Sequence, residues 1–250
     1  SFDATFVLKY DIQKYYSNEP WEVSLDVKKG DFITMEKVKI MAVLSILICL
    51  LASCSGNSLD YFDGHSVFIS GDDVYVVGSG CTGSSETDRP LLWKNDEQIT
   101  VGEIGNFNKA TSVFVEGSDV YITMSTENGA SLWKNGIVQD LSCNDEFSNA
   151  NSVCVAENKV FVGGKLNDMP VIWVDGKPLV LDNEGCINKI AYHNGKMYVV
   201  GYVGNAFGGT PCVWVDGMKE ELSVSSGEAN DIVFDGDDVY IAGKCYDGAA

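Results

Sequence analysis

Short apolar runs rich in Val, Ile, Tyr and Phe recur along the chain in a fixed order. They come in five pairs, and a short polar stretch typical of a turn separates the two runs of each pair. The step from the first apolar residue to the aromatic residue of the second run is 8 positions every time: 67 to 75, 113 to 121, 153 to 161, 190 to 198 and 232 to 240. This spacing predicts two antiparallel strands joined by a tight turn.

A Trp follows the second run in four of the five repeats, and a turn signal follows each Trp. Successive Trp residues are 40, 40 and 41 positions apart. The dipeptides Asn135-Gly136, Asp175-Gly176 and Asp216-Gly217 favour the positive φ angles of a type I′ hairpin turn. The sequence therefore predicts repeats of four short strands, with the fifth ending at Ala250 before its Trp. The residues that define the repeat are Tyr75, Trp93, Tyr121, Trp133, Phe161, Trp173, Tyr198, Trp214 and Tyr240.

A repeated four-stranded unit is typical of a β-propeller, because one blade cannot bury both faces alone and must stack on the next. We therefore predict an all-β fold over residues 65–250, with about four complete four-stranded blades plus a truncated fifth. A β-sandwich is the alternative, but it gives no reason for a Trp at regular steps. Because the repeats are incomplete at the C-terminus, we expect an open arc or a strained five-part ring with an exposed edge at each end.

A second pattern, nearer the start of the chain, predicts an export signal. Residues 35–53 begin with the charged segment Met35–Lys39, continue as an almost unbroken apolar run over 40–52 and end in small residues. The run is shorter than the roughly 20 residues that span a bilayer as a helix. A buried core helix that happens to end at Cys54 is the alternative.

The segment Leu51-Ala52-Ser53-Cys54 resembles the lipobox of bacterial lipoproteins. The repeats, with Val-Tyr-Val-x-Gly followed by Leu-Trp-Lys-Asn-Gly, resemble the β-propeller repeats of exported lipoproteins of the Bacteroidota type. The resemblance implies a lipoprotein signal peptide and signal helix over 35–53, a diacylglyceryl group on Cys54 and a linker over 54–64. It also implies a lipid anchor in the bacterial cell envelope, on the periplasmic side or exposed at the surface.

Residues 1–34 precede this signal and have two explanations. Either Met35 is the true start and the segment is upstream sequence translated in frame, or the segment is a cytoplasmic tail on a signal anchor. In both cases we leave it out of the expected fold as a non-native or separate extension.

The charge of the chain excludes one class of partner. Against 36 Asp and Glu there are 17 Lys and Arg, a net charge of -19, and no basic patch is visible. We therefore expect no nucleic-acid binding. The two histidines, His65 and His193, have no carboxylate motif beside them, so no metal or catalytic site is assigned. No cofactor is expected except a weak rim Ca²⁺ at the acidic turns, which are more simply explained as hairpin turns.

Polar residues stand where each predicted inner strand begins, at the mouth of the expected channel. They could bind a sugar, a peptide or an ion, although the same residue types also satisfy turn geometry. The variable connections at 78–89, 123–130, 163–169 and 201–210 are the other candidate binding regions. The candidate ligand ring consists of His65, Ser112, Asn151, Asn188, Lys189, Asn230 and Asp231.

Two functions fit these patterns. The first is a lipid-anchored extracytoplasmic binding or scaffold module for a glycan, peptide or protein partner, in which the repeated Trp packs between blades. The alternative is a polysaccharide-acting hydrolase or lyase with carboxylates at the channel mouth, for which Asp231 and Glu103 are the first candidates. The chain could also present a scaffold for a further domain. Cys143 and Cys186 are the pair to test for a disulfide, among the 15 pairings that six cysteines allow.

Overall fold

The computed structural model describes residues 4–10, 61–81, 87–95, 97–101, 105–106, 108–142, 147–205, 209–224 and 226–246. Every regular element in these ranges is a β-strand, which confirms the all-β class. Within the same ranges there is no helix long and apolar enough to cross a membrane. The predicted signal peptide at 35–53 and Cys54 lie outside the described residues.

Four sheets share one design, in which four consecutive strands pair antiparallel in chain order. We call these sheets units 1 to 4, and the short β6 (Gly105–Asn106) pairs with β4 beside unit 1. The strands are β2 (Tyr61–Ser70), β3 (Asp73–Cys81), β4 (Thr87–Lys94) and β5 (Glu97–Thr100) in unit 1; β7 (Lys109–Glu116), β8 (Asp119–Thr126), β9 (Gly129–Lys134) and β10 (Ile137–Asp140) in unit 2; β11 (Ser148–Ala156), β12 (Lys159–Leu166), β13 (Met169–Val174) and β14 (Lys177–Val180) in unit 3; and β15 (Gly185–His193), β16 (Lys196–Val203), β17 (Thr210–Val215) and β18 (Met218–Glu221) in unit 4.

The fifth sheet, unit 5, takes strands from both ends of the described chain. Its first two strands are β19 (Gly227–Asp235) and β20 (Asp238–Cys245), as the repeat predicts. Its third strand is β1 (Ala4–Tyr10), which pairs antiparallel with β20. Part of the segment 1–34, which the sequence pattern placed outside the fold, is therefore a strand of the last sheet.

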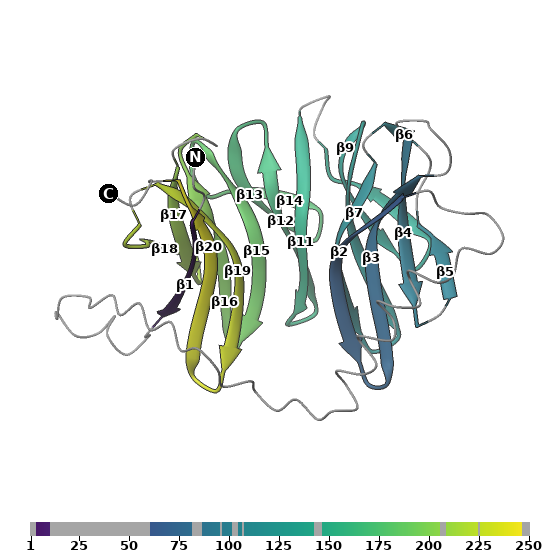
Figure 1. Ribbon diagram of the computed structural model, residues 1–250, viewed down its shortest axis with the longest axis horizontal. Coiled ribbons are helices and arrows are strands. Elements are labelled where there is room, and N and C mark those ends of the chain that lie inside the picture. The colour runs from purple at the N-terminus through teal and green to yellow at the C-terminus, as the bar shows by residue number, and fades with distance from the viewer. Residues whose placement is uncertain are drawn as a thin grey trace.

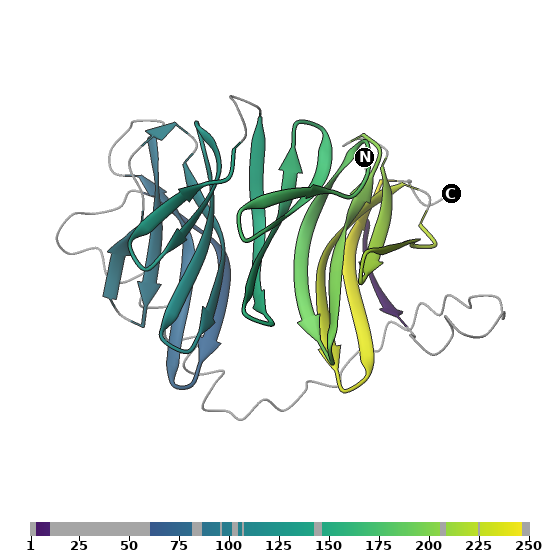
Figure 2. The same cartoon turned by 180° about the vertical axis from the view of Figure 1, so that it is seen from behind.

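The five units follow one another in an arc, with unit 3 at its middle (Figures 1 and 2). The first strand of each unit lies next to the first strand of the following unit, from β2 through β7, β11 and β15 to β19. Among the described residues, no contact of similar extent joins unit 5 back to unit 1. The expected arc of repeated units is thus the observed arrangement.

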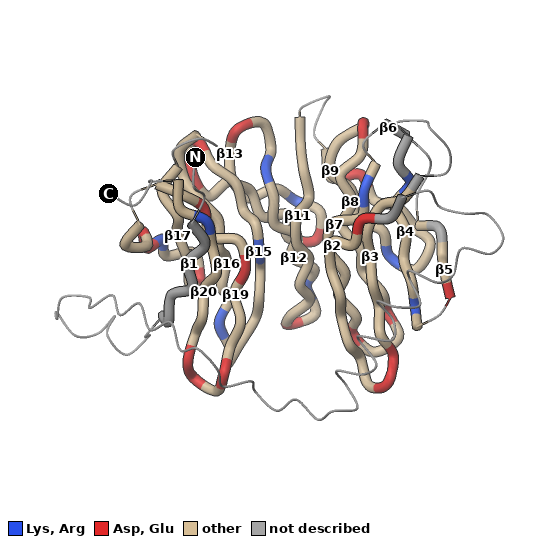
Figure 3. The backbone as a smooth tube through the Cα atoms, viewed as in Figure 1, with Lys and Arg blue, Asp and Glu red and all other residues tan. Residues whose placement is uncertain are grey.

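The tight turns that the sequence predicts are present in the structure. Asn135 and Gly136 have φ angles of 48° and 95°, and Asp216 and Gly217 have 50° and 83°, so these are type I′ turns. The side-chain oxygen of the Asn or Asp accepts a hydrogen bond from a backbone N–H at the start of the second strand, which ties the two hairpins of a unit together. The 2.9 Å donor and acceptor pairs are Val74 and Asn95, Val120 and Asn135, Val160 and Asp175, and Met197 and Asp216. Acidic residues gather at the lower hairpin tips of β2–β3 and β19–β20 (Figure 3).

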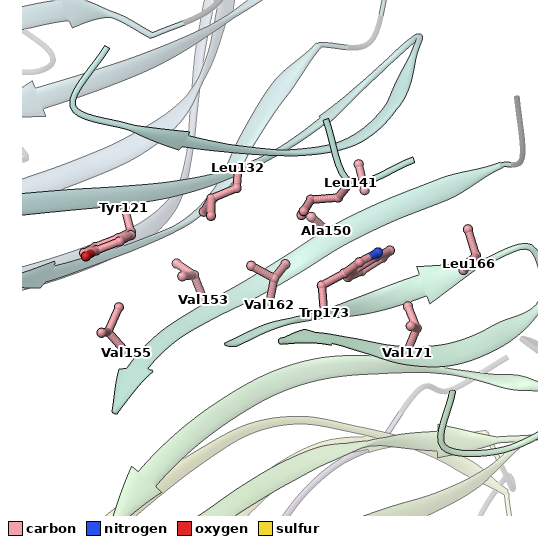
Figure 4. Packing of buried hydrophobic residues seen from close by; sticks show 11 residues of the cluster. Tyr121, Leu132, Leu141, Ala150, Val153, Val155, Val162, Leu166, Val171 and Trp173 are labelled. Carbon is pink, nitrogen blue, oxygen red and sulfur yellow. The ribbon is translucent and has the colours of Figure 1, made fainter. Parts of the chain in front are cut away.

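The hydrophobic core lies between units, not within them. One cluster joins Tyr121, Leu132 and Leu141 of unit 2 to Val153 and Trp173 of unit 3 (Figure 4). Trp173 is completely buried there. Similar clusters join the other neighbours, and they place the second-strand aromatic against the following unit and the third-strand Trp against the preceding one. Tyr198 and Trp214 of unit 4, Phe161 of unit 3, and Tyr75 and Trp133 at the contact of units 1 and 2 lie in these clusters.

The two ends of the arc expose apolar residues that the inner units cover. On β2, Val67 is 55% exposed, whereas the equivalent Val113 and Val153 are 3% and 4% exposed. On β19, Val233 is 57% exposed, whereas the equivalent Cys154 is 3% exposed. We call Val67 with Ile69, and Val233, the two end faces. Each lacks the neighbouring unit that covers the same position elsewhere in the arc.

Val153 and Val67 occupy equivalent positions on first strands but differ in burial, so their truncation is expected to affect stability differently. Val153→Ala removes two methyl groups from a filled core and is expected to lower the free energy of unfolding by about 2 kcal/mol. Val67→Ala removes the same groups from an end face and is expected to change it by less than about 0.5 kcal/mol. Urea unfolding of both variants measures the difference. An equal loss in Val67→Ala would show that the end face is covered in solution.

Candidate functional site

The predicted ligand ring lies inside the first strands, at a β-bulge that recurs in every unit. The pairing register of the first and second strands shifts by one residue each time. A bulge leaves one residue of the strand unpaired and bends the strand. The bulge residues are His65, Thr111, Asn151, Asn188 and Asn230, so four members of the predicted ring occupy one structural position.

Four of the five bulge side chains bond to the following unit. In each case the partner is the backbone carbonyl of the residue just before the next bulge. We call this series the polar belt. Its contacts are His65 Nδ1 to Ala110 O at 2.7 Å, Thr111 Oγ1 to Ala150 O at 2.6 Å, Asn151 Nδ2 to Ile187 O at 2.9 Å and Asn188 Nδ2 to Ala229 O at 2.9 Å. The belt therefore gives a hydrogen-bond donor from one unit to a backbone carbonyl of the next unit, and so links the first strands of units 1 to 5.

The residue after each bulge makes a second contact between units. Ser112 Oγ accepts from Val153 N at 3.4 Å, and Ser152 Oγ accepts from Ile190 N at 3.1 Å. Lys189 occupies this place in unit 4, and an ammonium group has no acceptor lone pair.

A carboxylate in unit 5 replaces the missing acceptor. Asp231 Oδ1 accepts from its own neighbour Ile232 N at 3.0 Å and lies 3.6 Å from Lys189 Nζ. Lys189 and Asp231, predicted as ligand residues, thus form an ion pair between units 4 and 5.

The last bulge residue has a different environment. Asn230 is exposed, and its side-chain oxygen accepts a hydrogen bond from Asn188 Nδ2 at 3.1 Å. Within the described ranges, no carbonyl of a following unit accepts from its amide nitrogen. At the other end of the belt, His65 Nε2 lies 3.3 Å from Asp63 Oδ2. The polar belt thus ends in exposed groups at the same two places as the apolar end faces.

The acidic turns proposed for Ca²⁺ hold ion pairs. Lys94 Nζ lies 2.9 Å from Asp73 Oδ2, and Lys134 Nζ lies 2.8 Å from Asp119 Oδ2. The hydrogen bond from Lys134 lowers the pKa of the Asp119 carboxyl group, and that from Lys94 lowers the pKa of Asp73. These shifts stabilise the ionised carboxylates, which is the opposite of what a general acid requires. Among the described residues, no three His, Cys, Asp or Glu side chains form a group that could hold a metal ion.

The connections between second and third strands differ in length from unit to unit. In units 2 and 3 they are two-residue turns, Glu127-Asn128 and Asn167-Asp168. The corresponding connections of units 1 and 4 are longer, and parts of them, residues 82–86 and 206–208, lie outside the described ranges. The predicted variable regions therefore combine two fixed turns with two longer segments.

An exposed aromatic residue lies beside one of these turns. Phe147 is 63% exposed, and its carbonyl accepts a hydrogen bond from Asn167 N at 2.6 Å. Lys165 Nζ lies 5.5 Å from the centre of the Phe147 ring and 3.1 Å from Asp168 Oδ1. We call Phe147, Lys165 and Asp168 the aromatic turn cluster. Lys165 and Asp168 lie in a predicted variable region, whereas Phe147 was not predicted, because its only signal in the sequence is an aromatic residue in a polar connection.

Three of the described cysteines are buried between or within the sheets. Cys154, Cys186 and Cys212 are buried free thiols. Burial raises the pKa of Cys154 and of Cys186 to about 11 and that of Cys212 to about 12. Thiols of this kind are poor nucleophiles near neutral pH. Cys143, the suggested disulfide partner of Cys186, and Glu103, a suggested catalytic residue, lie outside the described residues.

Comparisons with known proteins add little to this site. No family model matches the chain, and no curated protein matches it. Among solved structures, the chain is similar to the crystal structure of the computationally designed Ika4 protein, at 14% identity and a TM-score of 0.36. The similarity covers 63% of this chain and 94% of that chain. A TM-score this low supports no conclusion about fold or function.

Asn151 and Asn230 occupy equivalent positions in the polar belt, but their substitution is expected to lower the free energy of unfolding by different amounts. Asn151→Ala removes the hydrogen bonds from Asn151 Nδ2 to Ile187 O and Cys186 Sγ and is expected to lower the free energy of unfolding by about 1 to 2 kcal/mol. Asn230→Ala removes only an exposed acceptor at the end of the belt and is expected to cost less than about 0.5 kcal/mol. Urea unfolding at neutral pH tests both variants. If Asn230→Ala costs as much as Asn151→Ala, the belt continues past unit 5.

Proposed function

We propose that the chain is a lipid-anchored β-propeller module that binds a glycan, peptide or protein partner outside the cytoplasm. The observation that carries the proposal is the aromatic turn cluster, an exposed ring and an ion pair held on a rigid repeated scaffold. A binding site needs fixed polar groups beside an apolar contact surface, and rigid elements hold such groups more precisely than free loops.

Three features support the propeller as the scaffold. Units 1 to 4 are four-stranded antiparallel sheets, and the first strand of each lies against the first strand of the next unit. The polar belt links successive units by the same contact. The two end faces expose apolar residues, Val67 and Val233, at positions that a neighbouring unit covers elsewhere. In a propeller these faces meet further units or each other.

Most residues of the predicted ligand ring are engaged in contacts between units, so we place the proposed binding surface elsewhere. Ser112 is buried, and the side chains of Asn151, Asn188 and Lys189 are committed to neighbouring units. A ligand at these residues would have to replace contacts that hold the arc together. A ligand at the aromatic turn cluster would break no contact between units, because Phe147 already faces solvent.

The chemistry of the cluster suits a carbohydrate best among the three partner classes. The face of an aromatic ring stacks on the apolar face of a sugar, while an ammonium donates and a carboxylate accepts hydrogen bonds from hydroxyl groups. Lys165 and Asp168 supply both groups beside Phe147. The net charge of -19 favours a neutral or basic partner over a polyanion.

If the aromatic turn cluster binds a glycan, removing the ring of Phe147 is expected to weaken that binding. On a glycan array, the full chain is expected to bind a subset of neutral glycans, and Phe147→Ala is expected to weaken this binding at least about tenfold. Ile137→Ala is the matched control, because Ile137 is 75% exposed on the outer strand β10, in another unit. Equal binding by wild type and Phe147→Ala would remove the cluster from the proposal, and the same array printed with peptides tests the second partner class.

The anchor predicts a covalent lipid on one residue. Expressed in a bacterial host with an alkyne-labelled fatty acid, the wild-type chain is expected to incorporate the label and to sediment with membranes. Cys54→Ser is expected to lose the label and to remain uncleaved, because the thiol is the site of lipid attachment. Cys49→Ser, within the apolar run, is the control and keeps the label. Labelling that persists in Cys54→Ser would contradict the lipoprotein assignment.

A further inference from the structure

The strand β1 occupies the third-strand position of unit 5 in the same register as the third strands of units 1 to 4. Lys9 is opposite Tyr240, as Lys94 is opposite Tyr75 and Lys134 is opposite Tyr121. One position earlier, Leu8 is opposite Ile241, at the place that Trp holds in the other units. The pairing extends over seven residues, from Ala4 opposite Cys245 to Tyr10 opposite Val239.

The sequence of β1 follows that of the other third strands. Residues 4–9 read Ala-Thr-Phe-Val-Leu-Lys, and Gly129–Lys134 read Gly-Ala-Ser-Leu-Trp-Lys. Arg89–Lys94 read Arg-Pro-Leu-Leu-Trp-Lys. β1 departs from the pattern at Tyr10, where units 1 to 4 carry the Asn or Asp of a hairpin turn.

A charge rule within the chain explains why Lys stands at position 9. Where the second strand begins with Asp73 or Asp119, the residue after the Trp is a Lys that pairs with this Asp. Where the second strand begins with Lys, as in β12 and β16, the residue after the Trp is Val. The second strand of unit 5 begins with Asp238 and continues Val-Tyr, as in units 1 and 2. By this rule its third strand requires a Lys, and β1 carries one at the required register position.

We propose that the edge of β20 is a binding site for one extended peptide strand, and that Ala4–Tyr10 is the segment that fills it. Backbone hydrogen bonds along β20 supply affinity, as in other cases of strand addition. Specificity comes from the register, which sets a Lys opposite Tyr240 and a large apolar residue opposite Ile241. The segment before the predicted signal peptide is then part of the folded protein.

Proline identifies which backbone groups of β1 carry this binding. Thr5 is equivalent in register to Pro90, Pro170 and Pro211. The carbonyls of these prolines accept hydrogen bonds from backbone N–H groups on the side of the fourth strand, those of Val101, Leu181 and Leu222. The backbone at this position therefore points away from the second strand. Since successive backbone groups of a strand alternate in direction, the N–H of Phe6 points toward β20. Proline is thus harmless at position 5 and disruptive at position 6.

The test is amide hydrogen exchange on the full chain. Phe6→Pro is expected to speed exchange at least about tenfold at the amides of Ile241 and Gly243, which face β1, and Thr5→Pro is expected to leave them unchanged. Millimolar free peptide of sequence Ala-Thr-Phe-Val-Leu-Lys-Tyr is then expected to restore protection in Phe6→Pro. The same peptide with Glu in place of Lys is expected to fail.

Each outcome decides the proposal. Unchanged exchange in Phe6→Pro, or no protection by the matching peptide, would overturn it. The amide of Val153 in unit 3 reports whether Phe6→Pro is folded. If it is not, Lys9→Glu and Lys9→Arg in the full chain replace the proline pair, because both keep every backbone bond. Only Lys9→Glu is expected to speed exchange at Ile241 and Gly243, and equal exchange in the two variants would overturn the proposal.

Discussion

Each sheet of the arc must bury both faces against its neighbours, and the rest of the structure depends on this requirement. A four-stranded sheet of short strands has too little interior of its own, so its apolar side chains form a core only where two units meet. Val153 and Trp173 are buried because unit 2 lies beside them, whereas Val67 is exposed at the end of the arc. Stability is therefore a property of the contacts between units, as in other repeat proteins.

The same contacts explain why the polar ring has a structural role. The backbone carbonyl just before each bulge lies where two units pack together, and a carbonyl near such an interface needs a hydrogen-bond partner. The side chain of the preceding bulge residue supplies it from His65 to Asn188. Where Lys189 replaces the Ser of the next position, Asp231 supplies the acceptor. The proposed recognition site is therefore the aromatic turn cluster, whose Phe147 ring is exposed.

The repeat pattern predicted the four-stranded units because period, turn type and strand number are local properties. The step of 8 positions from 113 to 121 and the dipeptide Asn135-Gly136 are enough to predict the two hairpins of unit 2. The roles of Asn151 and Phe147 could not be predicted, since both depend on which unit lies next to the residue. The place of Ala4–Tyr10 was missed for another reason. This segment lies far from the other repeats in the sequence, and β1 has Leu8 where the other third strands have Trp, so the most visible residue of the motif is absent.

The proposed lipid anchor and the proposed strand site compete for the same part of the chain. The proposed cleavage before Cys54 would cut the covalent link between β1 and β2, and β1 would then be held only by its pairing with β20. While the link is intact, β1 is held near β20 at a high effective concentration. A free strand loses translational entropy when it binds, so the same hydrogen bonds give it a lower affinity. If both proposals hold, the unprocessed chain would keep β20 paired, whereas the lipidated chain would expose this edge to another strand. An open edge of this kind invites pairing with other chains, so processing and partner binding would be linked at unit 5.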